Sequence, residues 1–239
     1  MSFVHGSTGR AYVNGFDLSA FFKSVSGSEE VEAHDSTTLG ATAKTYMPGL
    51  VDATLSAEGL FSGAVGATDT VLSAALRGRT PVLWNWLPAG DTDGAFGYGL
   101  LAISTNYEID TPVDDLVSVT AEAQSNVGLE RTQILHPLAA RTATGNGVAR
   151  DHGAVTVNGG AGYLQVTAAS GTTPNLVGRI QHSVDNSVWV DLITFAAVAA
   201  ANNAQRLTVA GTVNRWTRAT WAITGTTPSF TFFAAFDRK

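Results

Sequence analysis

Alternation of apolar and polar residues with a period of two is the commonest pattern along the chain. Its clearest cases are residues 51–58, VDATLSAE, and residues 117–124, VSVTAEAQ. In both segments Val, Leu and Ala point to one side, while Asp, Thr, Ser, Glu or Gln point to the other. We therefore expect two half-buried strands with similar roles, each with one packed face and one polar face.

The same signal predicts further strands in the first half, with turns at Asn14-Gly15 and at residues 90–94. These strands are residues 11–13, 80–87, 97–105 and 107–109. One helix interrupts them: Thr68 or Asp69 can cap its start, and Gly78 closes it. Its apolar stripe consists of Val71, Leu72, Ala75 and Leu76, so the helix needs a sheet to pack on.

The alternation lapses over residues 24–49, which are rich in Ser, Glu, Thr, Gly and Ala. A loop of this length in a compact domain needs an explanation. Either the segment is disordered, or it is an arm that becomes ordered on a neighbouring subunit. Tyr46, Met47 and Pro48 stand at its end, where they would anchor the returning chain.

The second half has the pattern of a separate all-β unit. Strands are expected near residues 154–157, 163–168, 177–184, 188–195, 206–209, 215–223 and 229–236. Seven short strands predict a β-sandwich. Residues 195–205 are ambiguous, because their alanines also fit a short helix.

The predicted fold class is therefore mainly β: a first β-sandwich or barrel with one short helix and a long loop, followed by a C-terminal β-sandwich. A length of 239 residues suits two domains. We place them at residues 1–141 and 150–239, with a glycine-containing linker at 142–149.

Composition supports a folded, turn-rich protein, since 44% of residues are hydrophobic, 14% are charged and 25 are glycines. There is no cysteine, which excludes disulfides, thiolate metal sites and a cysteine nucleophile. The start lacks the pattern of a secretion signal, and the most lipid-like stretch, residues 195–201, is far short of the roughly 20 residues that span a bilayer. We expect a soluble protein made in the cytoplasm, without membrane insertion.

The two halves differ in charge. Residues 1–140 carry 16 Asp and Glu against 6 Lys and Arg, a net of −10, and residues 141–239 carry 4 against 8, a net of +4, which together give the overall −6. Gripping phosphate requires Lys and Arg, so the acidic half does not suit a nucleic-acid-binding protein. It suits a surface past which DNA slides without sticking.

Candidate chemistry is sparse. Residues 90–94, GDTDG, resemble the opening of a calcium loop, but Ala95 and Phe96 break that pattern, so a hairpin tip is favoured. His34, Asp35 and Ser36 are the residue types of a hydrolytic triad, yet neighbours in a loop cannot converge as a triad does. The remaining histidines, His5, His136, His152 and His182, have no metal-site spacing.

Carboxylates and tryptophans have a structural interpretation as well as a functional one. Glu29 to Glu32 and the pair Asp114-Asp115 would need a cleft for acid and base work, so solvated or intersubunit charge is favoured. Trp84 and Trp86 lie two apart on one strand and are expected in a core. Trp189, Trp216 and Trp221 are expected in a core or at its rim, with glycan stacking as the alternative. No phosphate-binding loop is present, and we expect no cofactor, no metal and no catalytic residue.

With the enzyme signals weak, the arrangement of motifs becomes informative. Residues 9–19, GRAYVNGFDLS, are followed by the long loop, by TTLG at 37–40 and by KTYMPGLVDATLSAEGLF at 44–61. Together with residues 107–122, YEIDTPVDDLVSVTAE, this arrangement resembles the major tail tube proteins of long-tailed bacteriophages. The resemblance covers residues 5–135 and is carried by diffuse motifs rather than by a catalytic signature.

The resemblance implies a non-enzymatic subunit that joins copies of itself into rings, hexameric in that family, which stack into a tube. Residues 24–49 would then reach the adjacent ring, and polar strand faces would line the lumen. The arm candidates are Glu29, Glu30, Glu32, His34, Asp35, Tyr46 and Met47. The lumen candidates are Asp52, Glu58 and Glu122.

The resemblance also implies partners and a location. The tube would form around a tape measure protein and end on tail terminator and baseplate proteins, and double-stranded DNA would pass through it without specific binding. The subunit would be assembled in the host cytoplasm and reside in the virion tail.

The second half resembles β-sandwich modules appended to virion proteins, on residues 179–192, RIQHSVDNSVWVDL, and 215–225, RWTRATWAITG. Such modules imply a host-surface glycan as a candidate partner. The surface-ligand candidates are Arg179, Trp189, Arg215 and Trp216. The basic excess of this half fits an anionic cell envelope and fits docking onto the acidic first half equally well.

Two hypotheses therefore lead: a tail tube subunit, and a virion decoration or adhesin protein that uses its second half. A hydrolase assembled from scattered residues is the third.

Overall fold

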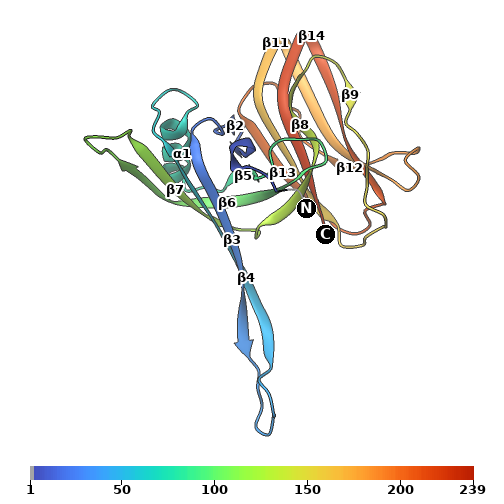
Figure 1. Ribbon diagram of the computed structural model, residues 1–239. Helices are drawn as coiled ribbons and strands as arrows, with labels where there is room; N and C mark the ends of the chain where they lie inside the picture. The colour runs from blue at the N-terminus through green and yellow to red at the C-terminus, as the bar shows by residue number, and fades with distance from the viewer. Residues whose placement is uncertain (1–2) are drawn as a thin grey trace.

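The computed structural model describes residues 3–239 and confirms a mainly β fold built from antiparallel strands. Figure 1 shows two lobes side by side, with a long hairpin projecting from the first. The first lobe contains β1 (Arg10–Val13), β2 (Phe16–Asp17), β3 (Phe22–Asp35), β4 (Tyr46–Leu60), α1 (Thr68–Gly78), β5 (Val82–Leu87), β6 (Phe96–Asp110) and β7 (Ser118–Ser125), after the 3-10 turn η1 (Gly6–Thr8). The second contains β9 (Gly145–Asn146), β10 (Arg150–Asp151), β11 (Gly160–Ser183), β12 (Val190–Thr194), β13 (Asn203–Val209) and β14 (Trp216–Arg238), and β8 (Glu130–Arg141) joins the two.

Four strands of the first lobe form a sheet in the order β3–β4–β7–β6. The two segments with the clearest alternation, 51–58 and 117–124, fall in β4 and β7 and pair with each other, Ser56 opposite Glu122. Leu55 and Ala57 on β4 and Ala121 on β7 are buried on one face, as the alternation predicts. The opposite face is polar.

Helix α1 covers the apolar face of this sheet. Val71, Leu72 and Ala75 pack with strand residues in one core. The helix boundaries match the expectation, but its cap does not: the N-cap is Ala67, with no side-chain cap bond. Thr68 instead donates its hydroxyl to the Leu60 carbonyl and accepts the Ser62 amide, so it ties the helix to the end of β4.

Most of the segment 24–49 forms strands. Its first part continues β3, and the chain returns in β4, so the expected arm is a two-stranded hairpin that leaves the body of the molecule (Figure 1). Both faces of its outer part lie in solvent, so no residue there needs to be apolar. This is why the sequence has no alternation in this segment.

In the second lobe, two pairs of expected short strands are single long strands. Residues 163–168 and 177–184 both belong to β11, and 215–223 and 229–236 both belong to β14. The two strands pair along their length and bend at Gly171 and Gly225, whose φ angles are +111° and +126°. The ribbon folds onto itself, so that Leu164 and Ile180 share one core. The glycines at these bends give the same sequence signal as a turn between two strands, so each long strand was predicted as two short ones.

Two weaker expectations differ in detail. Residues 195–205 contain no helix: Val198 bridges Leu176, and β13 begins at Asn203. The strand expected at 154–157 is reduced to one bridge, Thr156 to Val213.

The lobes are joined through β8. Its first residues pair with β6, and Gln133 to Arg141 pair with residues 230–236 of β14. Beside it lies a core shared by both lobes, in which the Tyr12 and Phe233 rings are 5.2 Å apart. The division at 142–149 stays a prediction about which parts fold alone.

Candidate assembly surfaces

The arm, residues 29–52 of the β3–β4 hairpin and its loop, exposes many apolar side chains. The cross-strand pairs Asp35–Tyr46 and His34–Met47 mark its outer part. The exposed apolar residues are Val31, Leu39, Tyr46, Met47, Leu50 and Val51. Such residues along a thin, two-stranded ribbon have no partner within the described chain, and a ribbon of this kind is only marginally stable alone.

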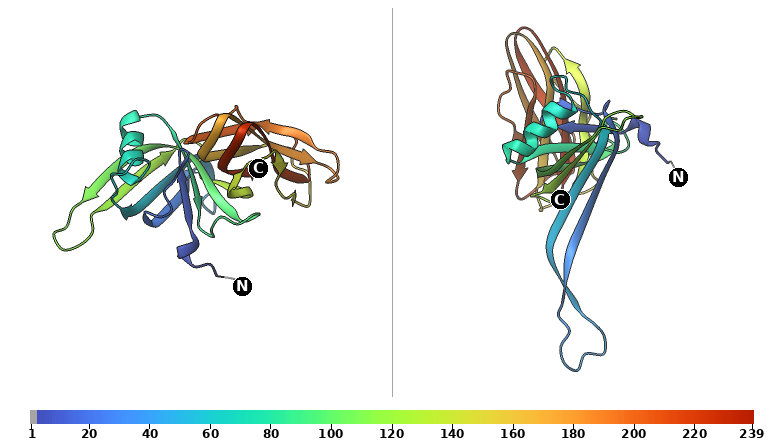
Figure 2. Two further views of the ribbon diagram at one scale, coloured as in Figure 1. Left: turned by 90° about the horizontal axis from the view of Figure 1, so that it is seen from above. Right: turned by 90° about the vertical axis from the view of Figure 1, so that its left-hand side faces the viewer.

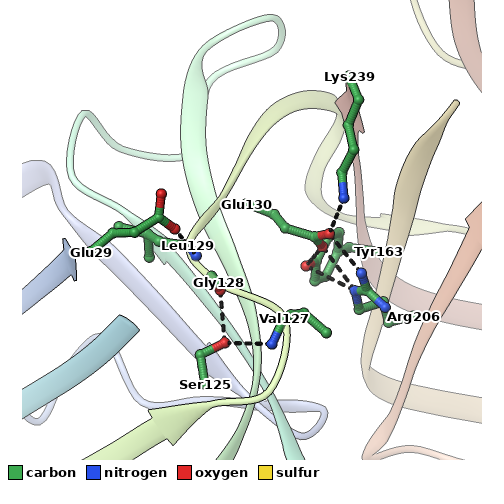
Figure 3. Close-up of polar contacts among 9 residues, drawn as sticks. All are labelled: Glu29, Ser125, Val127, Gly128, Leu129, Glu130, Tyr163, Arg206 and Lys239. Carbon is green, nitrogen blue, oxygen red and sulfur yellow. Dashed lines mark hydrogen bonds and ion pairs between the residues drawn. The ribbon is translucent and has the colours of Figure 1, made fainter. Parts of the chain in front are cut away.

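All seven arm candidates lie on this hairpin. Glu32 contacts His34 at 3.4 Å, and Asp35 lies 3.9 Å from Lys44, both as exposed pairs that contribute little stability. Hydrogen bonds from Thr37 lower the pKa of Asp35. Glu29 differs from the others, because its carboxylate accepts the Leu129 amide at 2.5 Å and fastens the base of the arm to the loop before β8 (Figure 3).

The three lumen candidates share one face of the four-stranded sheet. Asp52 and Glu58 alternate with buried residues on β4, and Glu122 stands opposite Ser56 on the same side. Asp52 also accepts a hydrogen bond from Gln124 of β7. The strand register adds further acids to this acidic face, namely Glu30, Glu108 and Asp110. The only Lys or Arg on these four strands is Lys23, at the bulge of β3 between Phe22 and Ser24.

This sheet has a free edge on each side. Within residues 3–239, β3 pairs only with β4. On the other side, β6 pairs with β5 over Tyr98 to Ala102, whereas residues 103–110 pair only with β7. Both edges carry main-chain groups that are available to another strand.

The surface-ligand candidates of the second lobe lie on the outer side of β12, β11 and β14. Arg179 is 3.3 Å from Asp191, and the Arg218 guanidinium lies 4.1 Å from the ring centre of Trp189. Arg215 binds Asp151 through two hydrogen bonds of 2.5 and 2.6 Å, and its guanidinium carbon lies 5.5 Å from the ring centre of Trp216. These bonds from Arg215 lower the pKa of Asp151 to about 2. The cations are thus already paired within the lobe.

We call the junction of the two lobes along β8 the β8 seam. A buried ionic cluster at this seam was not anticipated from the sequence (Figure 3). Glu130 of β8, with 3% of its side chain exposed, accepts two hydrogen bonds from Arg206 of β13 at 2.6 and 2.8 Å. Tyr163 of β11 donates its hydroxyl to the same carboxylate, and Lys239 lies 3.1 Å away. Only the fold brings these residues together, because they are far apart in the sequence.

The cluster shifts the pKa values of its members. Burial alone would raise the pKa of Glu130, but the bonds from Arg206 and Tyr163 outweigh it and lower that pKa. Burial, and then the charge of Glu130, raise the pKa of nearby Asp237 to about 6. At the seam, the cations Arg206 and Lys239 thus offset the burial of Glu130 but not that of Asp237.

The remaining chemical candidates have structural roles. In the 90–94 hairpin tip, Asp91 accepts the Tyr12 hydroxyl at 2.8 Å and the Leu138 amide at 2.6 Å, which tie the tip to β1 and β8. His136 is buried; its Nε2 accepts Arg141 at 2.9 Å, so its Nδ1 carries the proton and donates to the Phe232 carbonyl at 3.2 Å. Burial lowers the pKa of His136 to about 4. Trp84 is in the core, as expected.

Two structural features are absent from residues 3–239. These residues contain no cluster of three or more His, Asp or Glu side chains arranged to hold a metal ion. The same part of the chain has no helix with the length and apolar character that crossing a bilayer requires.

Comparisons with known proteins gave matches among solved structures alone. No family model matches the chain, and neither does any curated protein sequence. The chain is similar to a protein in the SPP1 tail tube (TM-score 0.44, 11% identity, 53% of this chain and 77% of the other) and to one in the virion of a native gene transfer agent (0.40, 16%, 46% and 84%). It is also similar to the SPP1 Dit protein, described as a hub of the adsorption apparatus (0.35, 14%, 95% and 98%).

Proposed function

We propose that the chain is a structural subunit of a bacteriophage tail, which assembles with copies of itself into rings that stack as the tail tube. The observation that carries this proposal is the four-stranded sheet with a free edge on each side. Free edges pair with strands of other chains through main-chain hydrogen bonds. When two different edges meet, the contact is heterologous and closes into a ring if the rotation permits.

The faces of this sheet support a channel. Helix α1 and the core cover one face, so a ring closed through the sheet edges would turn the acidic face inward. Asp52, Glu58 and Glu122 would then line the lumen. Carboxylates repel the phosphates of double-stranded DNA over roughly 8 Å at physiological salt, so DNA would pass without sticking.

The arm supports stacking. It extends away from the body along the direction of β3 and β4, and exposes apolar side chains that the chain itself leaves uncovered (Figure 1). In a stack of rings these side chains would be buried on the next ring. A tape measure protein inside the tube, and terminator and baseplate proteins at its ends, complete the proposal.

Electron microscopy of the purified full chain tests the proposal. We expect rings or hollow tubes of uniform width, with Glu58 and Glu122 facing the channel in a helical reconstruction. Rings that never stack would favour a ring at the end of a tail, such as a hub. Strictly monomeric protein at high concentration, with and without the remaining tail proteins, would contradict self-assembly.

A second candidate is a virion decoration or adhesin role of the second lobe. It is favoured by the partly exposed Trp189 and Trp216, each beside an arginine on one outer face. Aromatic rings of this kind can stack on sugars. This candidate would be favoured if the unassembled chain bound host cells and the Trp189→Ala variant did not.

A further inference from the structure

An amphipathic groove lies beside the free edge of β3, between the start of β3, β1 and the end of β5. Its cavity volume is about 330 Å³. Phe22, Val25 and Trp86 supply apolar walls, and Arg10, Lys23 and Ser24 supply polar ones. Within residues 3–239 neither Arg10 nor Lys23 has an ion-pair partner. The first lobe holds few other cations.

The loop between β6 and β7, residues 111–117, has the complementary chemistry. Val113 is fully exposed and Leu116 is 63% exposed, although both are apolar. Asp114 and Asp115 stand between them, both exposed and without an ion-pair partner in the described chain. Figure 2 shows this loop projecting at one end of the first lobe.

The sheet register places groove and loop at one level on opposite edges. Phe22 of β3 pairs with Gly59, Gly59 with Val119, and Val119 with Ile109 of β6. The loop starts two residues after Ile109. Copies related by rotation about a ring axis keep this level, apart from the stagger of a few residues that closed sheets require.

We propose that loop 111–117 of one subunit docks into the groove of the next, with Val113 and Leu116 against Phe22 and Trp86, and with Asp114 and Asp115 near Arg10 and Lys23. The proposal rests on ring formation through the edges of β3 and β6. It adds a specific side-chain contact at one end of that edge pairing. A main-chain ladder alone sets neither register nor partner, whereas this contact would set both.

Engineered cysteines test the contact directly, because the chain has no cysteine of its own. Under mild oxidation, Val113→Cys with Ser24→Cys should give a ladder of covalent multimers, since each subunit then carries both halves of the contact. Each single variant should give at most a dimer. Val113→Cys with Ser187→Cys, in an exposed loop of the second lobe, is the matched control and should give no ladder.

Charge exchange tests the energetics. Arg10→Glu with Lys23→Glu should raise the concentration needed for half-maximal assembly by about tenfold or more, and adding Asp114→Lys with Asp115→Lys should restore it. Rescue distinguishes a lost contact from a misfolded chain. An unchanged melting temperature for the isolated subunit is a second check.

The outcomes separate this contact from ring formation itself. Suppose that the parent protein forms rings. A Val113→Cys, Ser24→Cys double variant without a disulfide-linked ladder, or a charge exchange without rescue, would then overturn the docking proposal and leave the tube proposal standing. A fast-migrating monomer with an internal disulfide would show the loop on its own groove and would also overturn it. Absence of rings and of any ladder would remove both proposals.

Discussion

The arm and the β8 seam are both made of paired antiparallel strands, but they differ in whether their polar and apolar groups are buried and paired or exposed to solvent. At the seam, Glu130 is almost fully buried and its oxygens accept bonds from three side chains. In the arm, Met47 and Leu50 lie in solvent, and Glu30 stands opposite Asp52 as a pair of like charges. The seam satisfies its groups within one chain, whereas the arm leaves its groups exposed to solvent.

Under the proposed function, this difference separates residues that hold one subunit together from residues that would join subunits. A change at the seam should alter the stability of the isolated chain, and a change in the arm should alter only its assembly. Each experiment below tests that separation, from the largest expected effect on the chain's stability to the smallest.

Removal of residues 145–239 should abolish folding. Strand β8 would lose its ladder with β14, and the core around Tyr12 and Leu83 would lose Tyr163 and Phe233. We expect an insoluble or unfolded product by circular dichroism and gel filtration. A soluble first lobe that still forms tubes would instead support an independent domain ending near residue 141.

Replacing Glu130 with alanine should destabilise the chain by about 3–5 kcal/mol, because Arg206 would be left buried without its counter-ion. Urea denaturation of the isolated subunit measures this loss. The matched control is Asp151→Ala, which breaks the exposed pair with Arg215 and should leave the midpoint nearly unchanged. Equal effects of the two variants would contradict a special role for the seam.

Replacing Asp237 with asparagine should stabilise the chain at neutral pH. The pKa of this carboxyl is about 6 in the fold against an ordinary 3.8, so the native state favours its protonated form. That contribution is fully present below about pH 4 and is lost as pH rises through 6. Asp237→Asn should therefore gain up to about 3 kcal/mol at pH 7, and the gain should vanish near pH 4 in denaturation series. A gain that does not depend on pH would contradict this account.

Shortening the arm should change the stability of the isolated subunit least. Val31 pairs with Val51, so residues 32–50 can be replaced by Asn-Gly, the preferred two-residue hairpin turn. We expect a change of less than about 0.5 kcal/mol, together with rings that no longer stack. Normal tubes from this variant, seen by negative-stain microscopy, would remove the arm from the stacking contact.

Sequence reasoning succeeded where one face of an element packs and the other does not. The alternation in residues 51–58 and 117–124 predicted two half-buried strands, and the apolar stripe predicted α1 almost to the residue. It did not predict that 163–168 and 177–184 are one strand, because Gly171 gives the same local signal in a bend as in a chain reversal. The residue types that favour a turn can be recognised from neighbouring positions, whereas the continuity of a strand depends on its partner strand elsewhere in the sequence.

The candidate surfaces divide in the same way. Asp52, Glu58 and Glu122 lie on one face because strand periodicity is readable from sequence. The Glu130 cluster was missed, because nothing local to Glu130 distinguishes it from a solvated acid. The groove around Trp86 was also missed, since its walls come from three separate strands.

The pairing of β8 with β14 also orders events during synthesis. Residues 133–141 need strand residues 230–236 as neighbours, about 90 positions later in the chain. At 5–20 residues per second a ribosome takes roughly 5 to 20 s to make that stretch. During this delay β8 has only β6 beside it, and the ion pair at Glu130 still lacks Arg206. The ladder between β8 and β14 and the core around Phe233 can therefore form only after the chain has been made through residue 236.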